Sequence, residues 1–133
     1  MIDLHTHSTF SDGTFSPSEL IDYAILHNIK TLALTDHDTV DGVDILIEDA
    51  KNKNIEVLTG VELSINWHNK VIHVLGLNID INDSSLKELL ASQQALRTNR
   101  AYLIAELLEK ATGLTHVYEK ALSFATGGLV ARP

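Results

Sequence analysis

The sequence predicts an α/β fold with a largely parallel sheet, and two observations carry that prediction. Within the first 80 residues, short apolar segments typical of strands alternate with segments whose apolar residues recur at helical spacing. Their order is strand, helix, strand, helix, strand, strand, which favours a parallel sheet with helices packed outside it. The 133 residues allow one domain with a hydrophobic core, and 44% hydrophobic and 21% charged residues are ordinary for a globular protein.

Four strands are expected, at residues 1–6, 31–35, 56–65 and 71–77. In the first, apolar and polar residues alternate, so that Ile2 and Leu4 share one face. The second is continuously apolar from Leu32 to Leu34, which is typical of a strand buried on both faces. The turn at residues 66–70 makes the last two strands partners in a hairpin.

The first helix has a well-defined start, with Ser16 as N-cap, Pro17 at the first position and Glu19 completing a capping box. A second helix is expected at residues 41–54, with Asp38 or Asp41 in the role of N-cap. Spaced leucines then predict one long helix or two consecutive helices at residues 83–111. A shorter helix is expected at 115–124 and the start of another strand at 129–131.

Composition excludes several classes of protein and site. Without cysteine the chain has neither disulfides nor thiolate ligands, so any metal site must use His, Asp and Glu. A net charge of −8 argues against tight nonspecific nucleic-acid binding, an argument that weakens if acidic residues bind cations. The apolar runs are too short to span a bilayer and Met1 begins no signal peptide, so we expect a cytoplasmic protein without membrane contact.

Metal-ligating residue types gather at the ends of the expected strands. On the first strand, alternation places His5 and His7 on the same face, about 6.5–7 Å apart along the chain, so that both reach one cation. Two exposed polar histidines explain this pair alone equally well. Asp12 follows in the next turn, and a buried strand leads directly into Asp36 and His37, where parallel α/β folds place functional loops.

Two further charged or polar residues interrupt apolar strands. Glu62 and His73 each occupy a strand position where burial is costly unless the side chain is paired or binds a metal. Independent cases of this kind together predict a multinuclear metal site. His27, His68 and His116 lie outside these segments and are expected to be structural or exposed.

These segments resemble, in order, the motifs of the polymerase-and-histidinol-phosphatase (PHP) family of metal-dependent phosphoesterases. The matching stretches are residues 3–8, 11–13, 34–39, 60–64 and 73–76. Within the family, the chain is most similar to the bacterial enzymes that act on nucleoside 3′,5′-bisphosphates and short oligonucleotides. The resemblance implies the N-terminal part of a distorted (β/α)7 barrel at residues 1–80, a helical insertion that caps the site at 81–126, and the start of the next barrel segment at 127–133.

The resemblance also implies a site with two or three divalent ions, for which Mn, Zn and Fe all suit the ligand types. His5, His7 and Glu62 would bind one ion, Glu62 would bridge to a second held also by His73, and Asp12 and His37 would bind a third. It makes His37 and its neighbour Asp36 the candidate catalytic residues. The candidate phosphate contacts are Arg97, Arg100 and Arg132, although for the first two, which share a helix face, a solvated surface is an equal alternative.

The expected function is hydrolysis of a phosphate ester, in a nucleotide or short oligonucleotide, by a metal-activated hydroxide. The family pattern includes three later ligands, two His and one Asp, that are absent from these residues, and a closed barrel needs roughly 250 residues. We therefore expect a fragment, or self-association through an open sheet edge near Val57 and Val130. The alternatives are a truncated metal-binding fragment without full activity and an amidohydrolase-like hydrolase, which would need a carboxylated lysine that we do not find.

Overall fold

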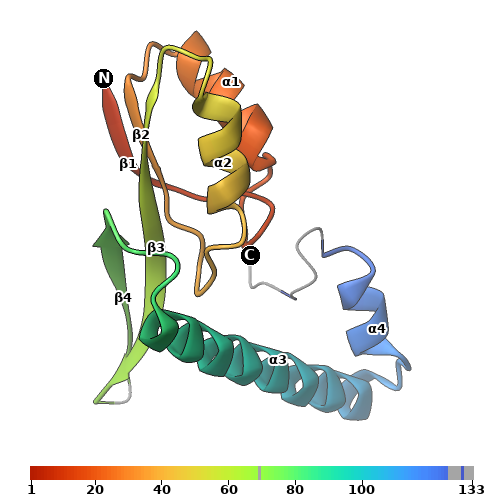
Figure 1. Ribbon diagram of the computed structural model, residues 1–133. Coiled ribbons are helices and arrows are strands. Elements are labelled where there is room, and N and C mark those ends of the chain that lie inside the picture. Colours follow the sequence, from red (N-terminus) through yellow and green to blue (C-terminus); the bar gives the residue numbers. More distant parts are fainter. Residues whose placement is uncertain (69, 126–129, 131–133) are drawn as a thin grey trace.

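The computed structural model describes residues 1–68, 70–125 and 130, and within them it has a curled sheet, two helices packed on that sheet and a long helix beyond it (Figure 1). The strands are β1 (Ile2–Thr6), β2 (Thr31–Leu34), β3 (Glu56–Trp67) and β4 (Lys70–Leu77). The helices are α1 (Pro17–Leu26), α2 (Val43–Ala50), α3 (Ser84–Thr112) and α4 (Val117–Leu122).

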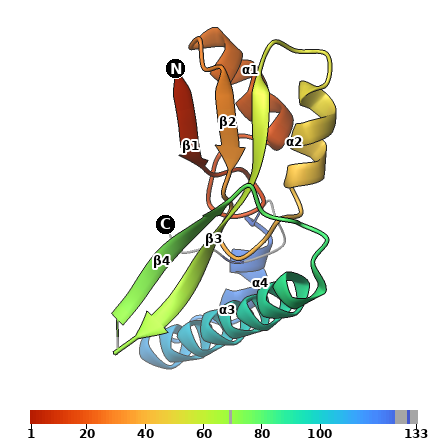
Figure 2. The ribbon, with the colours of Figure 1, turned by 60° about the vertical axis from the view of Figure 1, so that its left-hand side comes forward.

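The sheet has the order β1-β2-β3-β4, which confirms the predicted arrangement. β1 pairs with β2 and β2 with β3 in parallel, whereas β3 and β4 form the expected antiparallel hairpin. β3 uses residues 56–59 to pair with β2 and residues 60–67 to pair with β4. This change of partner lies at Gly60, where a Cβ atom would be 2.7 Å from the carbonyl oxygen of Leu34. Figure 2 shows the hairpin turning away from the parallel strands at this point, which gives the sheet its half-barrel curl.

Helices α1 and α2 pack side by side against the parallel part of the sheet and enclose the core (Figures 1 and 2). Helix α1 begins as predicted, because Ser16 accepts a hydrogen bond from the Glu19 amide and the Glu19 side chain accepts one from the Ser16 amide. The buried core residues are Leu20, Ile21, Ala24, Leu32, Leu34, Val43, Leu46 and Ala50. This core holds β2 in place, and β1 is attached by its parallel pairing with β2. The carboxyl ends of these two strands lead into most of the polar cluster described below.

Helix α2 is shorter than the predicted 41–54, and the predicted N-cap is wrong. The helix begins after Gly42, which makes no side-chain capping bond. The Thr39 hydroxyl instead accepts from the Asp41 amide, forming a turn ahead of the helix. Asp38 is buried and bonded to Ser64 and Arg97, and Asp41 precedes the actual N-cap, Gly42.

The long apolar pattern after residue 83 forms one continuous helix, α3, instead of two. Asp83 caps its N-terminus by accepting from the Leu86 amide, and Gly113 ends it with φ +73°. Among its 29 residues only Leu90 and Ala105 are buried, and the helix crosses the end of the sheet before leading into α4 (Figure 2). Of the predicted strand at 129–131, residues 129 and 131 lie outside the described residues, and Val130 belongs to no helix or strand.

Val57 pairs with Leu32 of β2 and packs against the core, but β4 pairs with β3 only from Gly60 onward. Among the described residues the other edge of β3 at residues 56–59 therefore has no strand partner, and association through the predicted open edge near Val57 stays a prediction. Within the described chain the outer strands are β1 and β4, and self-association through either edge stays a prediction. No helix in the described part of the chain is long and apolar enough to cross a membrane.

Leu46→Ala should destabilise the fold by about 2–5 kcal/mol, because it opens a cavity in the packed core. Leu46 is completely buried, whereas Ile45 on the same helix is 42% exposed, so Ile45→Ala is the matched control and should change stability by only about 0.5 kcal/mol. Urea unfolding followed by circular dichroism measures both variants. Equal destabilisation by the two substitutions would contradict this placement of the core.

Candidate metal centre

Four chain segments that end or cross near one point bring the polar residues together. The chain leaves β1 through His7 and leaves β2 through residues 36–38. The parallel pairing of β2 and β3 continues past the end of β2, because the Glu62 amide donates to the Asp36 carbonyl and the Asp38 amide donates to the Glu62 carbonyl. In the hairpin, His73 lies opposite Ser64 and is therefore a diagonal neighbour of Glu62.

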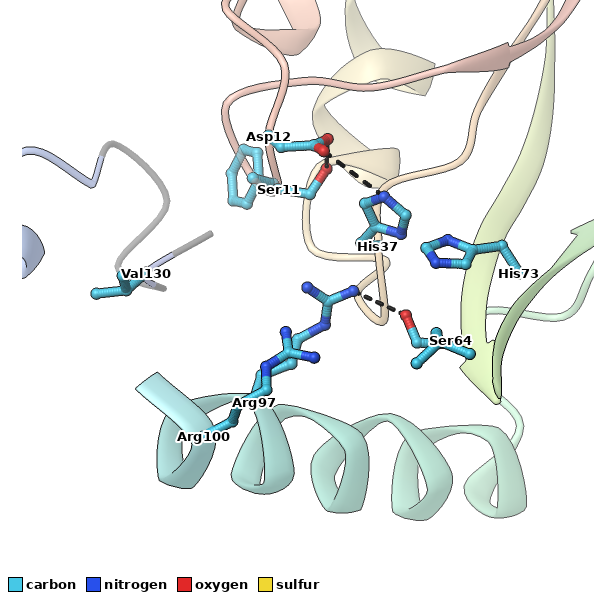
Figure 3. Close-up of a pocket in the computed structure, with 10 residues that line it drawn as sticks. Ser11, Asp12, His37, Ser64, His73, Arg97, Arg100 and Val130 are labelled. Atoms are coloured by element: carbon cyan, nitrogen blue, oxygen red, sulfur yellow. Dashed lines mark hydrogen bonds and ion pairs between the residues drawn. The ribbon is translucent and has the colours of Figure 1, made fainter. Parts of the chain in front are cut away.

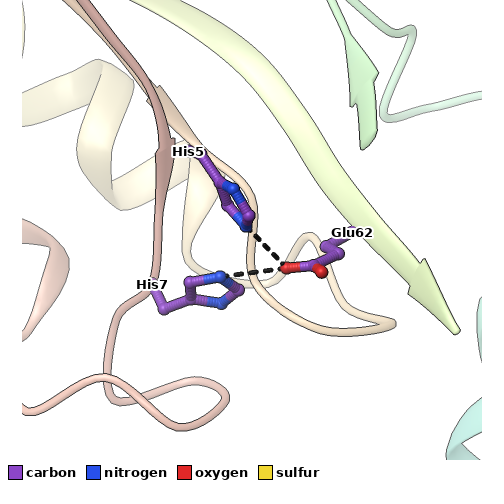
Figure 4. A group of neighbouring side chains, drawn as sticks. All are labelled: His5, His7 and Glu62. Carbon is purple, nitrogen blue, oxygen red and sulfur yellow. Dashed lines mark hydrogen bonds and ion pairs between the residues drawn. The ribbon is translucent and has the colours of Figure 1, made fainter. Parts of the chain in front are cut away.

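Glu62 lies at the centre of this cluster. Its side chain is 7% exposed, and its Oε2 atom is 2.9 Å from His5 Nε2 and 3.0 Å from His7 Nε2 (Figure 4). Its Oε1 atom is 2.8 Å from His73 Nδ1, and Oε2 is 3.7 Å from His37 Nδ1. One buried carboxylate therefore contacts four imidazoles that come from three other segments of the chain.

Asp12 reaches the cluster because the loop after β1 folds back on itself. Its carboxylate lies 3.4 Å from His7 Nδ1 and 3.6 Å from His37 Nε2. The next residue, Gly13, donates its amide to the Ser8 carbonyl, and a Cβ atom there would come within 2.1 Å of the His7 carbonyl oxygen. Only glycine fits this approach, so Gly13 sets the position of Asp12.

The cluster changes the proton affinities of two of its members. Burial acts to raise the pKa of Glu62, but the hydrogen bond from His5 and the nearby charges of His37 and His7 outweigh it, and the net pKa is lowered. Burial lowers the pKa of His37, and this effect exceeds the opposing influence of Glu62 and Asp12. Near neutral pH, Glu62 is therefore a carboxylate and His37 is mainly a neutral imidazole, which are the forms that bind metal ions.

The donor set fits divalent metal ions. Three groups of residues each place ligand atoms within 4.8 Å of one another: His5, His7 and Glu62; His7, Asp12 and His37; His37, Glu62 and His73. In the described part of the chain, His37 Nδ1 is the one buried side-chain polar atom without a hydrogen-bond partner, as expected for an atom awaiting a cation. The structure thus brings all six predicted ligands together, and their binding of metal stays a prediction.

Asp36 lies behind the cluster, outside these three groups. Its carboxylate is buried and accepts hydrogen bonds from the Ser8 amide at 2.7 Å, the Ser8 hydroxyl at 2.6 Å and the Ser11 hydroxyl at 2.6 Å. These bonds anchor the loop that carries Asp12. The catalytic role of Asp36 stays a prediction, and the observed contacts give it a positioning task. Sequence reasoning missed Ser8 and Ser11, whose only signal was their position beside the two motif segments.

A hollow of about 220 Å³ adjoins the cluster, and Figure 3 shows Asp12, His37 and His73 facing it. Arg97 and Arg100 also line it, and in Figure 3 both side chains rise from α3 toward the cluster. The third predicted phosphate contact, Arg132, lies outside the described residues. Ser64, which lines the hollow beside Arg97, was not predicted from the sequence.

The three histidines expected to have no part in the site, His27, His68 and His116, are all exposed. The ring of His27 contacts that of Tyr23 at a tilt of 44° at the end of α1, and His68 lies edge-on to Trp67 in the hairpin turn. His116 precedes α4. Each is outside the three groups of potential ligands.

Comparison with known sequences gives a consistent result. The profile of the PHP domain family matches residues 3–128. The chain is 47% identical over 125 residues to a 5′-3′ exoribonuclease of Haemophilus influenzae, covering 94% of this chain and 45% of that protein. It is 38% identical over 121 residues to a 3′,5′-nucleoside bisphosphate phosphatase of Chromobacterium violaceum, covering 91% and 42%. The chain thus spans about half the length of the curated relatives that it matches.

Solved structures share the fold. A Chromobacterium violaceum protein described as an amidohydrolase, with bound sulfate and no metal, superposes with a TM-score of 0.86 at 35% identity, over 96% of this chain and 45% of that one. A Bifidobacterium adolescentis protein proposed to be a metal-dependent phosphoesterase gives a TM-score of 0.82 at 27% identity, over 91% and 42%. Both likenesses confirm that the sheet is the N-terminal part of a larger α/β barrel.

Glu62→Gln should weaken Mn²⁺ binding more than any other single substitution that removes a charge from the cluster. Glu62 belongs to two of the three ligand groups, so we expect the Mn²⁺ affinity to fall by more than about 100-fold. This exceeds the loss that typically follows removal of a residue that only hydrogen-bonds to a metal ligand. Titration calorimetry with Mn²⁺ measures both stoichiometry and affinity.

Asp12→Asn is the comparison within the cluster, since Asp12 belongs to one group only, and His27→Ala is the control outside it. Asp12→Asn should retain more bound Mn²⁺ than Glu62→Gln, and His27→Ala should match the wild type. Unchanged Mn²⁺ stoichiometry and affinity in Glu62→Gln would remove the central role given to this carboxylate.

Proposed function

Since the chain belongs to the PHP domain family, we propose that it supplies the catalytic metal centre of a hydrolase that cleaves phosphate esters. The observation that carries the proposal is the buried Glu62 carboxylate in contact with four histidines beside a hollow lined by two arginines. With divalent cations bound to these ligands and two arginines beside them, the site would suit an anionic substrate. Relatives named as an exoribonuclease and as a bisphosphate phosphatase support the same reaction type.

The proposed substrate is a nucleotide or a short oligonucleotide. The support lies in the names of the relatives and in the arginines of the hollow, because guanidinium groups bind phosphate oxygens through paired hydrogen bonds. The chain as a whole carries a net charge of −8, so attraction of a polyanion depends on this local site. Arg132 is proposed as a further phosphate contact on the basis of sequence resemblance alone.

The six ligands His5, His7, Asp12, His37, Glu62 and His73 would hold two or three divalent ions, with Mn, Zn and Fe as candidates. When bound, such ions polarise the phosphoryl oxygens and lower the pKa of water, so that a hydroxide nucleophile is available near neutral pH. The protein itself orients the ester, since Arg97 and Arg100 face the hollow from the side opposite the histidines.

His37 is proposed to transfer a proton during the reaction. Because burial lowers its pKa, the neutral form predominates near pH 7 and is suited to accept a proton or to bind a cation. Donation to the leaving oxygen requires the protonated form, which Glu62 and Asp12 favour by their charge. The two carboxylates therefore make protonation of the buried His37 less costly.

Two alternative functions each rest on one observation. The chain covers about half of its curated relatives, which favours a metal-binding segment that is inactive without further residues. A structural relative is described as an amidohydrolase, which favours cleavage of C–N bonds. Phosphate ester hydrolysis is preferred over C–N cleavage because the arginines beside the candidate metal ligands match a phosphoryl group.

The Mn²⁺-loaded protein should release inorganic phosphate from a nucleoside 3′,5′-bisphosphate or shorten a 5′-phosphorylated RNA oligomer, and EDTA should abolish the reaction. Phosphate release and product chromatography measure the two reactions, with an anilide substrate as the test of C–N cleavage. Binding of Mn²⁺ without turnover of any substrate would support the inactive-segment alternative. Cleavage of the anilide alone would support the amidohydrolase.

A further inference from the structure

Asp38 is a completely buried aspartate on the opposite side of His37 from Asp36. Its backbone adopts φ +54°, a left-handed conformation that aspartate tolerates better than most residues. In this conformation the carboxylate reaches the hairpin and helix α3. There Oδ1 accepts from the Ser64 amide at 2.8 Å and Oδ2 accepts from Arg97 Nε at 2.5 Å.

Arg97 is held along one edge of its guanidinium group. Nε donates to Asp38, and Nη2 on the same edge donates to the Ser64 hydroxyl at 2.8 Å. Among the described residues these bonds use two of the five N–H groups, and the opposite edge of the fork remains available. Arg97 also lines the hollow with His37 and His73, and Figure 3 shows its guanidinium group raised above α3 toward that space.

The same loop fixes the helix that carries the arginine. Gln94, one turn before Arg97 on α3, donates its side-chain amide to the Asp38 carbonyl at 3.2 Å. Since α3 has only Leu90 and Ala105 buried, these polar contacts are a main part of its attachment near the site. Asp38 therefore fixes both the orientation of the Arg97 side chain and the position of its backbone.

We propose that Asp38 is a positioning residue for phosphate binding, which holds Arg97 so that the unused edge of its guanidinium group meets a phosphoryl group in the hollow. Ser64 is the second support of the same arginine. The inference rests on the proposed function and deepens it, because it names the buried pair that prepares the anion site. An arginine already fixed in place loses little side-chain entropy when an anion binds.

The direction in which one substitution changes the phosphate affinity distinguishes this positioning role from simple electrostatics. Asp38→Asn removes a negative charge close to the anion site, so Coulomb attraction alone predicts tighter phosphate binding. If Asp38 positions Arg97, the same change frees the guanidinium group and weakens phosphate binding. The two explanations therefore predict opposite shifts in affinity.

The test is binding of inorganic phosphate to the chain, measured by titration calorimetry with and without saturating Mn²⁺. We expect Asp38→Asn to raise the phosphate Kd about tenfold, equivalent to about 1.4 kcal/mol, with Mn²⁺ affinity unchanged. Arg97→Lys keeps the charge but loses the fork and should have a similar effect. The double variant should be no weaker than either single variant, since both remove the same interaction.

Asp22→Asn is the control, because it removes a carboxylate from a surface ion pair with Lys53 and should leave phosphate binding unchanged. Ser64→Ala should raise the phosphate Kd about threefold, as expected for loss of one hydrogen bond. If circular dichroism shows that Asp38→Asn does not fold, Ser64→Ala and Arg97→Lys decide the question.

Three outcomes would overturn the inference. They are equal or tighter phosphate binding by folded Asp38→Asn, unchanged binding by both Ser64→Ala and Arg97→Lys, and absence of phosphate binding by the wild type in both metal states. If the metal-free chain binds phosphate and Asp38→Asn weakens that binding, the inference is supported even if the chain hydrolyses no ester. Failure of the proposed function and failure of this inference are therefore distinguishable.

Discussion

The buried charge of Glu62 is the constraint on which the rest of the site depends. A carboxylate that is 7% exposed is costly unless it has close partners, and its partners are four histidines on β1, β4 and the segments after β1 and β2. Each must arrive within a few ångströms of one side chain. The parallel pairing of the first three strands and the hairpin that follows satisfy this requirement together. The geometry of the candidate ligands is therefore a direct consequence of the sheet topology.

The two aspartates beside His37 have different tasks although they belong to one tripeptide. Asp36 accepts three hydrogen bonds from Ser8 and Ser11 and so fixes the loop that carries Asp12. Asp38 faces the other way and joins Ser64 of the hairpin to Arg97 of the long helix. His37 lies between them, with one anchored residue on either side. The loop that carries Asp12 and the helix α3 that carries Arg97 are thus attached separately to the short segment at residues 36–38.

The sequence predicted the elements of the first 80 residues well, because helix caps and apolar periodicity are local signals. Burial cost within apolar strands pointed to Glu62 and His73, and strand alternation pointed to His5 and His7. The resemblance to the PHP family implied the full set of six, with Asp12 and His37. The prediction from sequence failed where contacts between residues distant in the chain determine the conformation. The left-handed backbone of Asp38 and its pairing with Arg97, 59 residues away, leave no local pattern.

The change of partner along β3 has a consequence for the lengths that this chain can tolerate. The position of Glu62 relative to His5 depends on the β1–β2 and β2–β3 registers, and its position relative to His73 depends on the β3–β4 register. A slip of one residue in either ladder turns the carboxylate to the opposite face. Evolution therefore has freedom to lengthen or shorten the far end of the hairpin, beyond Trp67, while the three steps from Thr59 to Glu62 are fixed in number.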